Sequence, residues 1–183
     1  GANWKSNKTK SEAREWVEKF YEFTPREGLE IIVFPPFTLL DYVSSLVKVN
    51  DLPFKIGAQD VSFGVGSRFH PERRQSMTGQ MPIDLIAEFA SYVLVGHSET
   101  RRIYPDNLIK GKMEEVLDGQ IEGVEVEPIL CISKIEELDN MLKSDQIIAY
   151  EPLEAIGTGN AAIPEDVQKM VEQIKNSGQS IGK

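Results

Sequence analysis

The chain has 183 residues, of which 40% are hydrophobic and 27% charged, a composition typical of one globular domain over residues 1–183 and not of a collagen, a linker or a disordered chain. A net charge of −9 argues against nucleic acids and anionic membranes as partners, although one or two cations would suffice to hold a small phosphorylated ligand. We expect a soluble cytoplasmic protein for three reasons. A single cysteine cannot form an internal disulfide, no apolar run approaches the roughly 20 residues of a membrane span, and the polar N-terminal segment is unlike a signal peptide.

Apolar spacing predicts alternating helices and strands along the chain. The first predicted element is a helix over residues 11–23, and Thr9 and Glu12 stand before it in the arrangement of a capping box. The elements predicted after it are a strand over 30–34, a helix over 39–47, a strand over 55–59, a long loop over 61–79, a helix over 83–90, a strand over 92–95, a helix over 107–118, a strand over 129–132, a short helix over 135–142, a strand over 147–150 and a helix that begins at Pro164.

Five strands, each followed by a helix, are typical of βαβ units around a parallel sheet. The strands are short and mostly apolar on both faces, as strands covered by helices must be. Right-handed crossovers leave an open doubly wound sheet or a (β/α)₈ barrel as the main outcomes. Neither GxGxxG nor the P-loop pattern of an open nucleotide-binding sheet occurs, so the pattern favours the barrel.

Three polar residues are candidates for chemistry, one at the start of the chain and two after predicted strands. Lys5 lies close to the first residue, His97 follows the strand over 92–95 after one glycine, and Glu151 directly follows the strand over 147–150. The ends of parallel strands share one rim, so these side chains can converge as a cation, a proton donor and a carboxylate base, a set suited to proton abstraction beside a carbonyl. Each also has a plain structural explanation: a solvated lysine, a histidine that caps the next helix, and an exposed loop carboxylate.

The remaining candidates for chemistry give little support to a metal or thiol mechanism. His70 lies in the long polar loop and is expected to be solvated, whereas Cys131 ends an apolar run and is expected in the core. Two histidines and one cysteine stand far apart without ligand spacing, so no metal is expected.

Several segments resemble the triosephosphate isomerase family. In the family's order they are residues 3–5 (NWK), 58–62 (AQDVS), 78–79 (TG), 95–99 (VGHSE), 149–152 (AYEP) and 155–159 (AIGTG). The resemblance spans almost the whole chain. It implies a (β/α)₈ barrel and an aldose–ketose isomerase that interconverts dihydroxyacetone phosphate and glyceraldehyde 3-phosphate through an enediolate, without cofactor or metal, in glycolysis and gluconeogenesis.

The resemblance also implies a catalytic role for three residues. Glu151 would be the base that moves a proton between the two carbons flanking the enediolate. His97 would polarise the carbonyl. In the family this histidine is neutral, and a place at a helix N-terminus would keep it so, because the positive partial charge there disfavours the imidazolium. Lys5 would stabilise the developing negative charge and help to hold the phosphate.

Further roles follow from the same resemblance. Asn3 would bind substrate beside the catalytic lysine, and Glu99 would support the catalytic groups. Backbone N–H groups around Gly157 would grip the phosphate as a lid closes and excludes water, because an exposed enediolate phosphate loses its phosphate.

The sequence also departs from the family pattern. Leu153 and Glu154 stand in the lid where many relatives have a tryptophan at the second position, and Ser133 and Lys134 replace a Gly-Glu pair. The third loop is enlarged and charged, with Arg68, Arg73 and Arg74. In the family this loop inserts into a partner subunit, so a homodimer through the loop around Thr78 is expected.

Length is the largest departure, because a full barrel typically has about 250 residues. Residues 1–5 would supply only a shortened first strand, and nothing in the sequence corresponds to strands seven and eight. We therefore expect an incomplete barrel. The alternative to an isomerase is a non-catalytic barrel remnant that serves as a binding or assembly module.

Overall fold

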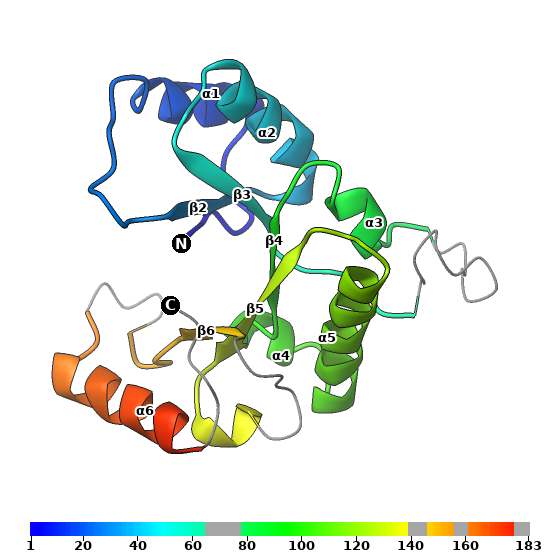
Figure 1. Ribbon diagram of the computed structural model, residues 1–183, viewed down its shortest axis with the longest axis vertical. Coiled ribbons are helices and arrows are strands. Elements are labelled where there is room, and N and C mark those ends of the chain that lie inside the picture. Colours follow the sequence, from blue (N-terminus) through cyan, green and yellow to red (C-terminus); the bar gives the residue numbers. More distant parts are fainter. Residues whose placement is uncertain (65–77, 139–145, 156–160, 178–183) are drawn as a thin grey trace.

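The computed structural model describes residues 1–64, 78–138, 146–155 and 161–177, and these contain one sheet of six parallel strands in chain order. The strands are β1 (Ala2–Asn3), β2 (Ile31–Phe34), β3 (Phe54–Ala58), β4 (Tyr92–Val95), β5 (Glu127–Ile132) and β6 (Ile147–Tyr150). The sheet curls, and the helices lie on its convex side (Figure 1). This is the architecture of part of a (β/α)₈ barrel, as the pattern predicted.

The helices before β6 connect successive strands, as in βαβ units, and α6 follows the last strand. They are α1 (Lys10–Glu18), α2 (Leu40–Val49) with a preceding 3₁₀ turn (Phe37–Leu39), α3 (Ile83–Ile86), α4 (Ser98–Arg101), α5 (Asp106–Ile121), a 3₁₀ turn (Ile135–Leu138) and α6 (Pro164–Asn176). The predicted capping box of α1 is confirmed, because Thr9 and Glu12 each bond to the other's backbone N–H. No helix in the described ranges is long and apolar enough to cross a membrane.

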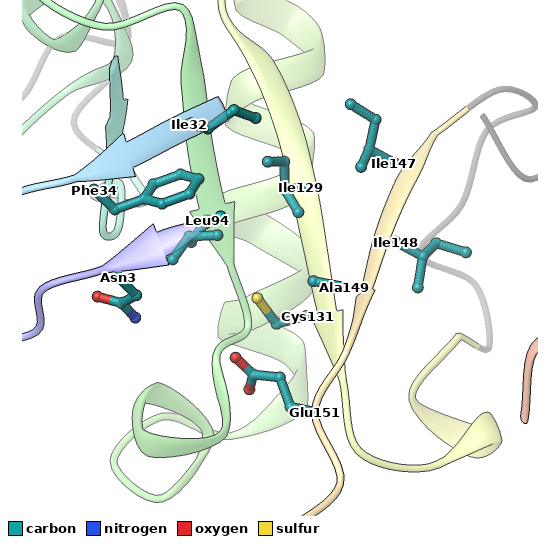
Figure 2. A pocket seen from close by; sticks show the side chains of 11 residues that line it. Asn3, Ile32, Phe34, Leu94, Ile129, Cys131, Ile147, Ile148, Ala149 and Glu151 are labelled. Carbon is teal, nitrogen blue, oxygen red and sulfur yellow. The ribbon is translucent and has the colours of Figure 1, made fainter. Parts of the chain in front are cut away.

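Two apolar clusters cover the two faces of the sheet. The larger fills the space between the sheet and its helices. The smaller lies on the concave face and centres on four buried side chains: Phe34, Leu94, Ile129 and Cys131. A cavity of about 300 Å³ opens over this second cluster and reaches from Asn3 to Glu151 (Figure 2).

Some element bounds differ from the predicted ones. The helix expected over residues 11–23 ends at Glu18, because Phe20 and Phe23 are drawn into tight turns that place both rings against Phe54. The helix expected over 83–90 is the single turn α3, since the chain must turn to enter β4, and Ser91, the residue before that strand, donates its N–H to Ile56 O. Residues 139–142 of another predicted helix lie outside the described ranges.

Candidate active site

Three strands place the predicted residues at one rim of the sheet. Lys5 follows β1, His97 follows β4 and Glu151 follows β6, and since all strands are parallel these ends point the same way. Glu99, on α4, joins them into a row: Lys5 Nζ lies 2.8 Å from Glu99 Oε1, His97 Nδ1 lies 3.7 Å from Glu99 Oε2, and His97 Nε2 lies 3.0 Å from Glu151 Oε1.

Lys5 has an unusual backbone conformation, with φ at +53°. Left-handed backbone is rare for a residue with a side chain and persists only where the surroundings enforce it. Here the N–H of Lys5 donates to Asn3 Oδ1 at 2.9 Å, and its ammonium donates to Glu99. The Lys5 ammonium in turn holds the pKa of Glu99 below its ordinary value.

The local structure around His97 determines which ring nitrogen carries the proton. His97 is the N-cap of α4, and its Nδ1 accepts the backbone N–H of Glu99 at 3.2 Å. A neutral imidazole that accepts at Nδ1 carries its proton on Nε2. That N–H points at the Glu151 carboxylate, so the side chain, which is 9% exposed, offers a hydrogen-bond donor at the rim.

Glu151 projects from the end of β6 over the concave cavity (Figure 2). Its Oε2 accepts the backbone N–H of Ser98 at 3.0 Å, while Oε1 meets His97. The thiol of Cys131 lies beneath it, and burial together with the Glu151 carboxylate raises the pKa of that thiol well above its ordinary value. The carboxylate therefore stands between two N–H donors and an uncharged thiol.

Several other predicted positions fall outside the part of the chain that the structure describes. Gly157 and the rest of 156–160, His70, and Arg68, Arg73 and Arg74 lie outside the described residues. Within the described residues, no group of three His, Cys, Asp or Glu side chains could hold a metal ion.

Two neighbours of the site were not among the predicted residues. Gln59, directly after β3, donates from its side-chain amide to Lys5 O and to Phe34 O. Ser98 supplies the N–H that holds Glu151. The predicted strand over 55–59 contained Gln59, and only the observed end of β3 at Ala58 places it directly after a strand, as Glu151 is; no sequence signal selects a backbone N–H.

The row has a definite chemical capacity. It combines an ammonium, an imidazole N–H and a carboxylate at the mouth of a mostly apolar cavity. A carboxylate that can take a proton, next to a donor that can bond a developing oxyanion, is the arrangement that proton transfer beside a carbonyl requires.

Comparison with known proteins agrees with this geometry. A family model described as triosephosphate isomerase matches residues 1–182. The chain is 35% identical to a triosephosphate isomerase of Aquifex aeolicus over 96% of its own length and 74% of that protein. It is 34% identical to one of Saccharomyces cerevisiae, with 96% and 73% covered, and 30% identical to one of Thermus thermophilus, with 96% and 74% covered.

Proposed function

The chain belongs to the triosephosphate isomerase family, a family of isomerases, and we propose on that basis that it interconverts dihydroxyacetone phosphate and glyceraldehyde 3-phosphate through an enediolate, in glycolysis and gluconeogenesis. One observation carries the proposal: the 3.0 Å contact between His97 Nε2 and Glu151 Oε1 at the rim of the sheet. It brings the proton donor and the base to one place, although they stand 54 positions apart in the chain.

In the proposed reaction Glu151 removes a proton from the carbon next to the substrate carbonyl and returns it to the neighbouring carbon. His97 donates its Nε2 hydrogen bond to the carbonyl oxygen, where negative charge develops, and carries protons between the two oxygens. A substrate carbonyl would take over the donor that now meets the Glu151 carboxylate.

The same proposal assigns the phosphate to the other end of the row. Lys5 and Asn3 would bind it together with backbone N–H groups near Gly157, and Glu99 would hold the Lys5 ammonium in place. Support comes from the 2.8 Å bond between Lys5 and Glu99, which fixes the cation at the rim.

A shortened carboxylate tests the proposal. Glu151→Asp withdraws the base by one methylene, about 1.5 Å, and misplacement on that scale costs on the order of a hundredfold in turnover. Glu15→Asp makes the same change on the exposed surface of α1 and should leave turnover unchanged. The measurement is a coupled assay with glyceraldehyde 3-phosphate. Unchanged turnover in Glu151→Asp would remove the base role.

We further propose a cytoplasmic homodimer that forms through the loop around Thr78. Thr78 and Gly79 form an exposed turn, a shape suited to insertion into a neighbouring subunit. Light scattering at micromolar concentration should report twice the chain mass. A monomer with normal turnover would contradict this assembly.

A further inference from the structure

A side-chain hydrogen bond joins two strands that are not neighbours in the sheet. The hydroxyl of Tyr92, the first residue of β4, donates at 2.5 Å to Oε1 of Glu30, the residue before β2, and β3 lies between these strands. We propose that this bond, the Tyr92–Glu30 clasp, positions Lys5: it holds the angle between β2 and β4 that brings the Lys5 ammonium to Glu99. The inference rests on the proposed function for its catalytic meaning, because Lys5 is there the cation that binds the phosphate.

The clasp spans a strand that contributes little to the concave face. Among the described residues, the concave apolar cluster has members from β2, β4, β5 and β6 but none from β3. Gly57 of β3 is the ladder partner of Tyr92, and the ring of Phe34 fills the space that a side chain at position 57 would occupy. Side chains of β2 and β4 therefore meet across β3, and their contacts determine how closely these two strands approach.

The chemistry of the clasp keeps it closed at physiological pH. A hydroxyl that donates to a carboxylate forms a charge-assisted hydrogen bond, roughly twice as strong as one between neutral groups. The bond to Glu30, together with burial, raises the pKa of Tyr92 to about 12, so the hydroxyl retains the proton that it donates. The negative charge of Glu127 on β5 opposes ionisation of the phenol as well. The clasp is therefore a permanent contact and not a pH switch.

The clasped strands also determine where Lys5 meets its partner. Strand β1 ends shortly before Lys5 and pairs with β2, while β4 leads into α4, which carries Glu99. The 2.8 Å bond between Lys5 Nζ and Glu99 Oε1 thus closes a path that runs from β1 through β2 and β3 to β4. The angle that the clasp holds is about the long axis of β3, so its loss acts along the whole length of the strands. If β2 and β4 moved apart, the ammonium would move away from Glu99.

Tyr92→Phe removes only the hydroxyl, and the readout is the pKa of Glu99 in an NMR titration. Lys5 holds this pKa below its ordinary value, so the pKa should rise toward that value when the two side chains separate. The phenol is uncharged throughout this titration, so the substitution removes no charge that could act on Glu99 directly. Tyr21→Phe makes the same change on a ring that is 47% exposed and should leave the pKa of Glu99 unchanged. An unchanged pKa in Tyr92→Phe would overturn the proposal.

The other partner of the clasp gives a test in which charge and geometry act in opposite directions. Glu30→Ala removes a carboxylate, and loss of a negative charge by itself lowers the pKa of another carboxyl group. Loss of the clasp raises the pKa of Glu99, so a rise in Glu30→Ala comes from geometry. Glu125→Ala removes an exposed carboxylate at the same end of the sheet, shortly before β5, and should not raise this pKa. A pKa of Glu99 that does not rise in Glu30→Ala, or that rises equally in Glu125→Ala, would refute the proposal.

Kinetic constants separate this inference from the proposed function, because the pKa of Glu99 is measured without substrate. Tyr92→Phe should raise the KM for glyceraldehyde 3-phosphate about threefold, a change typical of the loss of one hydrogen bond. The change in kcat should be smaller, since β4 and β6, which lead to His97 and Glu151, are not joined by the clasp. A raised pKa of Glu99 with an unchanged KM would uphold the clasp and remove Lys5 from phosphate binding. An unchanged pKa with normal turnover would reject the clasp and leave the function in place.

Discussion

Gly57 and Phe34 are expected to be coupled through the concave core, and Gly57→Ala tests this coupling. A Cβ at position 57 would lie 2.1 Å from Phe34 Cε1 and 2.4 Å from Cδ1, whereas carbon atoms in contact prefer 3.5–4.0 Å. The ring would have to move by about 1.5 Å, and Phe34 is 2% exposed, so it has little room to do so. Overpacking on this scale destabilises a protein by about 1–3 kcal/mol.

Removal of the ring should abolish this penalty. In a Phe34→Ala background, Gly57→Ala should be neutral or slightly stabilising, because alanine restricts the unfolded chain more than glycine and φ of Gly57 is not positive. Denaturant midpoints of the two single variants and the double variant give the coupling free energy, which we expect to be at least 1 kcal/mol. An equal cost of Gly57→Ala in both backgrounds would show that the ring does not occupy this space.

Three further predictions concern titrating groups. Lys5 lowers the pKa of Glu99, so their pairing stabilises the fold at pH values above the ordinary carboxyl pKa, and this stabilisation is lost as the pH falls through the lowered pKa. Lys5→Met should raise the pKa of Glu99 in an NMR titration. The single thiol, Cys131, is buried with a raised pKa, so a thiol reagent should modify it rapidly only after denaturant is added. The Glu30 carboxylate raises the pKa of Tyr92 to about 12, a contribution to stability present below pH 10 and lost as the pH rises through 12; Glu30→Gln should lower that pKa in an absorbance titration.

The regular parts of the fold could be predicted from the sequence. Strands β4 and β6 have the predicted bounds, because each is a short apolar run followed by Gly96 or Glu151. Strand β1 and helix α4 were beyond the reach of periodicity, since two and four residues are too few to show a period. Their places depend on contacts with distant strands.

The sequence indicated which residues form the site better than it indicated the hydrogen bonds between them. The positions of His97 and Glu151 after strands indicated a shared rim, and the structure brings them within 3.0 Å. The positive φ of Lys5 and the two bonds from Gln59 depend on where β1 meets β2, and no local pattern encodes this.

The order of the strands has a mechanical consequence for the site. Its two ends are carried by β1 and β6, the first and last strands of the sheet, which are five strand-to-strand steps apart. In a flat sheet with about 4.8 Å between neighbours, those strands would stand roughly 24 Å from one another. Three side-chain contacts nevertheless connect Lys5 to Glu151, so the curl of the sheet sets their spacing. A small change in the angle between each pair of neighbouring strands would add up over the five steps. Bending of the whole sheet would therefore change the spacing between Lys5 and Glu151 even if the distance between each pair of neighbouring strands stayed the same.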